Sequence, residues 1–123
     1  YEWEKAARGN TGYLYPWGNS MDGSKANYNN SGDPWETNFQ ATTPVGYFNG
    51  ENSTINSPSI YGVYDMSGNV REWTVTSDNE GHYYLKGGAF SHGQNSNELK
   101  TWGHEELEPD DEYNNVGFRC VKD

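Results

Sequence analysis

Two carboxylates seven residues apart bracket a turn in the segment of this chain best suited to chemistry. Asp65 and Glu72 flank the tripeptide Ser-Gly-Asn at 67–69, which is typical of a tight turn. Such a turn can fold the chain back, so that both carboxylates and several backbone carbonyls converge. Calcium takes six to eight oxygen ligands of these kinds at about 2.3–2.6 Å. The segment therefore suits a calcium site, and an ordinary turn with Glu72 solvated or paired with Arg71 is the alternative.

A second group of oxygen-bearing side chains begins at Asn27. Asp33, Glu36, Thr37 and Asn38 follow it at irregular spacing. These residue types suit a hard cation. Their spacing is nevertheless more typical of a polar loop, and on the residues alone both interpretations stay open.

Histidine and cysteine give weaker indications. No two of His82, His92 and His104 have the i, i+4 spacing of metal ligands on a helix, and the last two are expected to be exposed. Cys120 is the one cysteine, so the chain has no internal disulfide. It falls in an apolar strand pattern, which predicts a buried and unreactive thiol.

An acidic run near the C-terminus carries six carboxylates within residues 105–112. Such a block usually forms a solvated face. The alternative is a surface that binds a cation or a basic partner.

Few regular elements are predicted to position these residues. Apolar side chains at i, i+3 and i+4 predict a helix over residues 1–8. Short apolar or alternating runs predict strands at 61–64, 73–76, 83–86 and 116–121. The long stretch between the helix and the first strand has no sustained period, and loops of that length need a function or an organiser such as a metal ion. The expected class is α+β with little regular secondary structure.

The composition indicates a folded domain with an aromatic core and an acidic surface. Only 16 of the 123 residues are Leu, Ile, Val or Phe and the net charge is −10, a combination typical of disorder. However, 15% of the residues are aromatic, and each aromatic side chain buries on the order of 150–250 Å². A few aromatic residues can therefore replace many aliphatic ones.

The same numbers bear on partners and location. A net charge of −10 without a basic cluster argues against nucleic acid as a partner. No apolar run approaches the ~20 residues that span a bilayer, and the first residues do not resemble a signal peptide. Neither nucleic-acid binding nor membrane insertion is expected, and the compartment stays unassigned.

Several motifs together resemble those of the formylglycine-generating enzyme family, also called sulfatase-modifying factor domains. The matching segments run in family order along the whole chain: Glu2-Trp-Glu-Lys-Ala-Ala-Arg-Gly9, Tyr15-Pro-Trp-Gly-Asn19, Ala26-Asn27, Thr43-Pro-Val-Gly46, Tyr61-Gly-Val-Tyr-Asp-Met-Ser-Gly-Asn-Val-Arg-Glu-Trp-Thr74, Lys86-Gly-Gly-Ala-Phe90 and Gly117-Phe-Arg-Cys-Val121. The resemblance implies an α+β, C-type-lectin-like fold that is rich in loops. It also implies one domain over residues 1–123 that lacks the family's N-terminal part, whose uncovered edge a partner or self-association would cover.

The resemblance implies two structural calcium sites. In the family, one calcium is held by side chains at the positions of Asp65 and Glu72 and by carbonyls at those of Gly68 and Val70. All four positions fit here.

The second family calcium matches this chain less well. Its ligands fall at the Asn27 side chain, the carbonyls of Tyr28 and Phe39, and an acid at the position of Thr37. Here Thr37 replaces that acid and Glu36 stands beside it, so the second site departs from the family pattern.

The family's catalytic cysteines are missing. Oxidising members carry a cysteine pair in the segment that corresponds to residues 89–116, and this segment contains no cysteine. A thiolate is needed there to bind copper and to take part in the oxidation. Formylglycine-forming oxidase activity is therefore not expected.

The resemblance leaves two functions open. The first is a non-catalytic binding, display or accessory module of bacterial or phage origin, stabilised by calcium, with an unknown protein or small molecule as its ligand. Polar and aromatic residues suit such adaptable contacts, and the candidates are His92, Asn95, Asn97, Trp102, His104 and Tyr113. The alternative is one domain of a larger enzyme, such as a sulfoxide-synthase-like non-haem iron enzyme, whose catalytic residues lie outside this chain.

Overall fold

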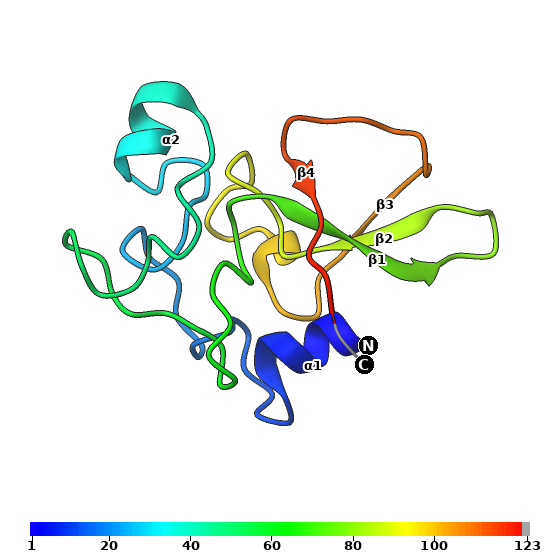
Figure 1. The fold of residues 1–123 in the computed structure, drawn as a ribbon, viewed down its shortest axis with the longest axis horizontal. Coiled ribbons are helices and arrows are strands. Elements are labelled where there is room, and N and C mark those ends of the chain that lie inside the picture. The colour runs from blue at the N-terminus through cyan, green and yellow to red at the C-terminus, as the bar shows by residue number, and fades with distance from the viewer. Residues whose placement is uncertain (122–123) are drawn as a thin grey trace.

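A four-stranded mixed sheet forms one side of the molecule, and long loops with a short helix form the other (Figure 1). The structure is a computed structural model that describes residues 1–121, and only the backbone at 37–39. The strand order is β3-β2-β1-β4. The elements in chain order are α1 Glu2–Arg8, α2 Pro34–Phe39, β1 Arg71–Ser77, β2 Tyr83–Lys86, the 3₁₀ helix η1 Asn97–Leu99, β3 Glu105–Leu107 and β4 Val116–Gly117.

The register of the sheet places residues from distant parts of the chain side by side. Strands β1 and β2 form an antiparallel hairpin in which Glu72 lies opposite Lys86. Strand β3 pairs antiparallel with β2, so that Glu106 lies opposite Tyr84. Strand β4 pairs parallel with β1 and brings Gly117 next to Glu72. Glu72 is therefore close to the C-terminal segment, although about 45 residues separate them.

Helix α1 confirms the sequence prediction for residues 1–8. Trp3 and Ala7 are buried on one face and pack with Met66 in a small hydrophobic cluster. Acidic residues stand in the first turn and basic ones in the last, which complements the helix dipole. The Glu4 and Arg8 side chains form an ion pair one turn apart.

Helix α2 lies in a stretch that was predicted as loop. Asp33 caps its N-terminus, because one carboxylate oxygen accepts hydrogen bonds from the backbone N–H groups of Trp35 at 2.9 Å and Glu36 at 3.0 Å. Proline occupies the first helical position, where no N–H group is needed. The Asp-Pro pair thus marks the start of a helix, although the segment lacks the apolar periodicity that usually predicts one.

Two further strand predictions need correction. Residues 61–64 form a turn and irregular backbone rather than a strand. Only Val116–Gly117 of the predicted strand 116–121 pairs with the sheet, after which Phe118 is 77% exposed. Cys120 is exposed rather than buried, because the pairing ends at Gly117 and the chain no longer alternates against a covered face.

The core consists of small aromatic clusters, as the composition suggests. The second cluster contains Tyr15, Ala26, Tyr28 and Leu99, with Trp17 packed against it. Among residues 1–121, no helix is long and apolar enough to cross a membrane.

Candidate functional site

Glu72 is the most heavily engaged of the predicted calcium ligands. It is buried on β1, and its Oε2 accepts a hydrogen bond of 2.7 Å from Nε1 of Trp3. Arg119 binds both carboxylate oxygens, with Nε 2.6 Å from Oε2 and Nη2 2.6 Å from Oε1. The partner of Glu72 is therefore Arg119 and not Arg71, which pairs with Glu105.

Asp65 lies beside this pair. The remaining Arg119 N–H groups bind the carbonyl of Tyr64 at 3.1 Å and that of Asp65 at 3.0 Å. One carboxylate oxygen of Asp65 accepts a 2.7 Å hydrogen bond from the Gly46 N–H group. Burial raises the pKa of the Asp65 carboxyl, against the opposing effects of the Gly46 hydrogen bond and the Arg119 charge. The structure thus brings Asp65 and Glu72 together around a guanidinium.

The loop between these acids packs directly on the loop that carries Asn27. A Cβ atom at Gly68 would lie 2.2 Å from the Asn27 carbonyl oxygen, so only glycine fits there. The next N–H group, of Asn69, donates to that same oxygen at 2.9 Å. The Asn69 side chain accepts from the Thr43 N–H group at 3.0 Å. Gly68 and Asn27, which were assigned to different predicted calcium sites, are therefore in direct contact.

Asn27 has one oxygen that the described residues leave without a partner. The side chain is fully buried, and its Nδ2 donates to the Ala41 carbonyl at 2.8 Å. Its Oδ1 is buried without a hydrogen bond to any described residue. An unsatisfied buried oxygen costs about 1–3 kcal/mol, and a cation would satisfy it.

The other predicted ligands of the second site differ in their surroundings. Glu36 is buried and lines a small cavity with Asn29 and Gln40. The Tyr28 carbonyl already accepts a hydrogen bond from the Ser31 N–H group. The side chains of Thr37, Asn38 and Phe39 lie outside the described part of the chain.

Within the predicted ligand surface, His92 and Tyr113 flank a partly buried ion pair between Arg71 and Glu105. Arg71 donates to Glu105 at 2.8 Å and to Asn115 at 3.0 Å, and its guanidinium lies 5.3 Å from the centre of the Tyr113 ring. Nδ1 of His92 accepts a 2.9 Å hydrogen bond from the Ala89 N–H group. Its Nε2 lies 3.4 Å from Glu105. His92 is therefore half-buried and structurally engaged, which corrects the expectation of an exposed side chain.

The other four predicted surface residues are exposed. Lys100 binds the Asn97 side chain at 2.8 Å and lies 5.4 Å from the Trp102 ring centre. His104 stacks on Tyr84 with ring centres 4.4 Å apart. Asn95 is exposed on the loop before η1. Tyr113 is exposed as well, so five of the six residues are exposed and His92 is half-buried. Within residues 1–121, no hydrogen bond, ion pair or ring contact joins His92 and Tyr113 to the other four.

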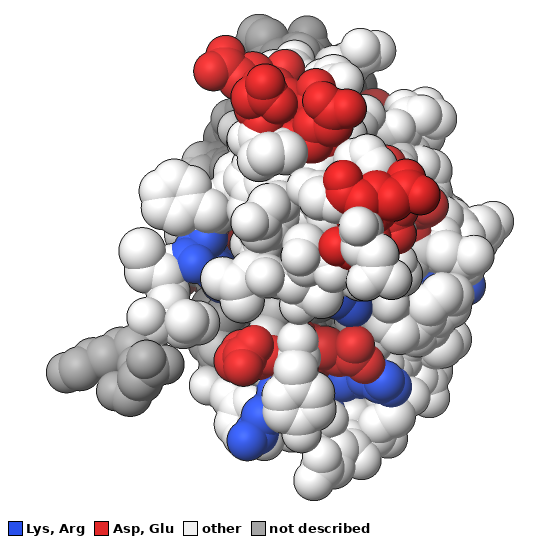
Figure 2. Space-filling view, turned by 90° about the vertical axis from the view of Figure 1, so that its right-hand side faces the viewer, with Lys and Arg blue, Asp and Glu red and all other residues white. Residues whose placement is uncertain are grey.

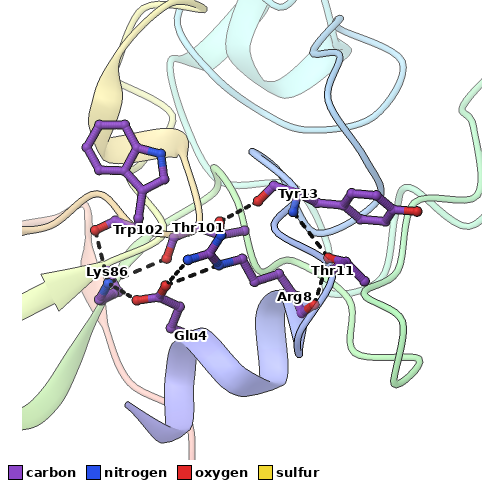
Figure 3. A network of polar contacts seen from close by, with 7 residues as sticks. All are labelled: Glu4, Arg8, Thr11, Tyr13, Lys86, Thr101 and Trp102. Carbon is purple, nitrogen blue, oxygen red and sulfur yellow. Dashed lines mark hydrogen bonds and ion pairs between the residues drawn. The ribbon is translucent and has the colours of Figure 1, made fainter.

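A polar network that the sequence did not reveal fixes α1 to the sheet (Figure 3). Lys86 is buried at the end of β2, and its ammonium group lies 3.3 Å from Glu4 Oε2. It also donates to the carbonyls of Thr101 at 3.4 Å and Trp102 at 3.2 Å. This lysine connects the helix, the sheet and the exposed segment around Trp102.

A second group missed at the sequence level consists of Asp78, His82 and Glu106. One ligand atom of each lies within 4.8 Å of the others. The Asp-His spacing of four residues was a usable signal in a hairpin turn. It does not involve a histidine pair on a helix, which is the pattern typical of metal ligands.

Known proteins resemble this chain over nearly all of its length. Inactive C-alpha-formylglycine-generating enzyme 2 of Bos taurus is 32% identical over 131 residues, covering 98% of this chain and 41% of that protein. Formylglycine-generating enzyme of Mus musculus is 29% identical over 147 residues, covering 99% of this chain and 37% of that protein. The solved structure of PvdO from Pseudomonas aeruginosa matches with a TM-score of 0.70 at 20% identity, covering 95% of this chain and 48% of that one.

These similarities establish the fold and the family. The chain spans about 40% of the length of the curated relatives it matches. Its mixed sheet, few helices and long loops are those of the C-type-lectin-like fold of formylglycine-generating enzymes. A family model described as the Sulfatase-modifying factor enzyme 1-like domain matches residues 1–123. The chain therefore belongs to the sulfatase-modifying factor, or formylglycine-generating-enzyme-like, domain family.

Proposed function

We propose that this domain is a non-catalytic binding module whose loops are held in place by calcium. Residues 89–116 contain no cysteine, and the one thiol, at Cys120, lies exposed beyond β4. A thiol-dependent oxidation therefore lacks its reactive group in that segment. The similar protein of Bos taurus is itself described as inactive, which supports a role other than catalysis.

The observation that carries the calcium proposal is the buried Oδ1 of Asn27, which has no hydrogen-bond partner among the described residues. A hard cation beside this oxygen would satisfy it, with the carbonyls of Tyr28 and Phe39 as further ligands. Glu36, which is buried and adjacent in sequence to Thr37, is the acid proposed to replace the one missing there. Calcium bound in this way would connect α2, through Glu36 and Phe39, to the loop that carries Asn27.

Calcium at Asp65 and Glu72 is a second part of the proposal, with a weaker fit. The two carboxylates and nearby carbonyls are suitable oxygen donors, and burial raises the pKa of Asp65, so a cation would stabilise its charged form. Glu72, however, already accepts hydrogen bonds from Trp3 and Arg119. Calcium there would have to share Glu72 with a guanidinium.

The proposed ligand surface is the exposed part of the segment between Ser91 and Asn115. Trp102 is 43% exposed and Tyr113 52% exposed, and rigid aromatic side chains are efficient contact residues. The partly buried pairs of Lys86 with Glu4 and Arg71 with Glu105 help to hold the segment to the sheet. The arrangement suits a variable polar surface on a fixed scaffold.

The proposal is tested by calcium titration of chelator-treated protein, followed by thermal unfolding. We expect calcium to raise the melting temperature in the unmodified protein and much less in Glu36→Gln. Glu51→Gln, at an exposed loop position, is the matched control and should respond like the unmodified protein. Incubation with a cysteine-containing sulfatase peptide and copper should give no formylglycine. Formation of the aldehyde would contradict the non-catalytic function.

A further inference from the structure

We propose that Asp78, His82 and Glu106 form a surface site for a divalent transition metal, with Zn²⁺ as the ion that fits best. One ligand atom from each of the three side chains lies within 4.8 Å of the other two. The group comprises an imidazole nitrogen and two carboxylate oxygens. It shares no residue with the proposed calcium sites and is independent of them.

Backbone hydrogen bonds build the site into the β1–β2 hairpin. The Asp78 N–H group donates to the His82 carbonyl at 2.9 Å, where the two strands end. One Asp78 oxygen, Oδ1, accepts from the N–H groups of Glu80 at 2.8 Å and His82 at 2.9 Å. Asp78 and His82 are therefore held four residues apart across a closed turn.

The third residue comes from the neighbouring strand through the register of the sheet. Glu106 lies opposite Tyr84, and His82 precedes Tyr84 by two residues. Because side chains alternate along a strand, residues two apart point to the same face. Glu106 therefore projects toward the face on which the His82 ring lies.

The His82 ring is already held in one orientation in the metal-free protein. Its Nδ1 lies 2.7 Å from Oδ2 of Asp78. A carboxylate that fixes a histidine ring is a common feature of metal sites, where it sets the orientation and basicity of the imidazole. Asp78 can hold the ring in this way or bind the ion itself, and in both cases the ring loses little freedom on binding.

The donor set favours a transition metal over calcium. Calcium requires six to eight oxygen ligands, whereas only two carboxylates converge here. Imidazole binds Zn²⁺, Ni²⁺ and Cu²⁺ well, and zinc accepts mixed nitrogen and oxygen ligands in a four-coordinate shell. A fourth side chain is close, because Nε2 of His104 lies 3.7 Å from Oε1 of Glu106. The Glu106 side chain is 45% exposed, so water can complete the coordination.

The surrounding charge also favours a cation. The chain carries a net charge of −10. Figure 2, turned from Figure 1 so that its right-hand side faces the viewer, shows more acidic than basic side chains on this side. Glu80 and Glu108 act electrostatically on His82. Fields of this sign raise the local concentration of divalent cations.

The test is a Zn²⁺ titration by calorimetry of chelator-treated protein carrying Cys120→Ser, which removes the exposed thiol as a competing ligand. We expect one Zn²⁺ per chain, at least tenfold weaker binding in both His82→Gln and Glu106→Gln, and unchanged binding in Glu51→Gln, at an exposed loop position. Excess Ca²⁺ should not displace the zinc. Unchanged melting temperatures in the chelated variants would show that the fold is intact, since all these side chains are at least partly exposed.

Cobalt gives a second readout that reports the ligands directly. Co²⁺ bound at this site should show visible absorption that is lost in His82→Gln, and zinc should shift the NMR signals of the His82 ring selectively. Zinc binding that persists unchanged in the two ligand variants would overturn the proposal. So would a failure of the parent protein to bind zinc at millimolar concentration.

Discussion

The Arg119 guanidinium binds both carboxylate oxygens of Glu72, with each N–O distance at 2.6 Å. The two residues are 47 positions apart, and the parallel pairing of β4 with β1 brings them together. Trp3 donates to the same carboxylate from α1. One buried acid therefore connects the N-terminal helix, the central strand and the C-terminal segment.

Replacing Arg119 by Gln should destabilise the protein strongly. The Glu72 side chain is only 7% exposed, so removal of the guanidinium leaves a buried carboxylate with Trp3 as its remaining donor. Removing one partner of a buried pair typically costs about 3–5 kcal/mol. The measurement is urea unfolding in chelator. Arg8→Gln, which breaks the partly exposed pair with Glu4, is the control and should cost about 1 kcal/mol or less.

The same variant separates the two roles proposed for Glu72. If calcium binds between Asp65 and Glu72, loss of Arg119 frees the carboxylate, and calcium should restore part of the lost stability. The comparison is the free energy of unfolding with and without calcium in Arg119→Gln combined with Glu36→Gln, which weakens the proposed calcium site at Asn27. Equal values would argue against calcium at this position.

Calcium removal should lower the stability of the unmodified protein by mass action. At a calcium concentration 100 times the dissociation constant, the bound ion contributes about 2.7 kcal/mol. Differential scanning calorimetry in chelator and in excess calcium measures the shift. Identical curves, with metal shown to be absent from the chelated sample, would exclude calcium as a structural ligand.

Gly68→Ala should be more destabilising than Gly62→Ala, although both glycines have nearly the same backbone conformation. Their φ angles are 77° and 79°. A left-handed conformation costs a non-glycine residue about 1–2 kcal/mol, which both variants incur. Of these two glycines, Gly62 has open space where a Cβ would lie, whereas at Gly68 a Cβ would lie 2.2 Å from the Asn27 carbonyl oxygen. The difference in urea midpoint reports that contact, and equal midpoints would contradict it.

In the metal-free protein, His82 should titrate above its ordinary pKa. The hydrogen bond and charge of Asp78 raise the pKa of His82, and the pairing lowers the pKa of Asp78 to about 2. Because the folded pKa of His82 exceeds the unfolded value of 6.5, its stabilisation is complete below pH 6.5 and is lost as the pH rises through the raised pKa. NMR titration measures it, and Asp78→Asn should return the pKa toward 6.5.

The elements with strong local signals were predictable. Helix α1 has an amphipathic pattern, and the predicted strand 83–86 coincides with β2. Strand β3 was not predictable in this way, because its Glu-Glu-Leu sequence has a weak intrinsic preference for strands and lies in an acidic run. Pairing with β2, a tertiary contact, gives it strand geometry. Cys120 was misplaced for a similar reason, since the alternation of 116–121 contains no sign that the pairing ends at Gly117.

The sequence predicts which residues belong to the candidate sites, but it does not predict which residues they contact. The convergence of Asp65 and Glu72 follows from the turn between them, and the structure brings both to Arg119. That Arg119 is the partner depends on β4, which the local sequence around Glu72 cannot specify. The unpaired oxygen of Asn27 likewise becomes visible only when the surrounding backbone is in place.

The close packing of Gly68 on the Asn27 backbone also limits how this sequence can change over time. A larger residue at either position, or a shift of either loop, must be accommodated by the other, because the two backbones touch and share a hydrogen bond. Substitutions in the two loops are therefore epistatic. Homologues should therefore change these two loops together, whereas exposed side chains such as Trp102 are free to diverge on their own.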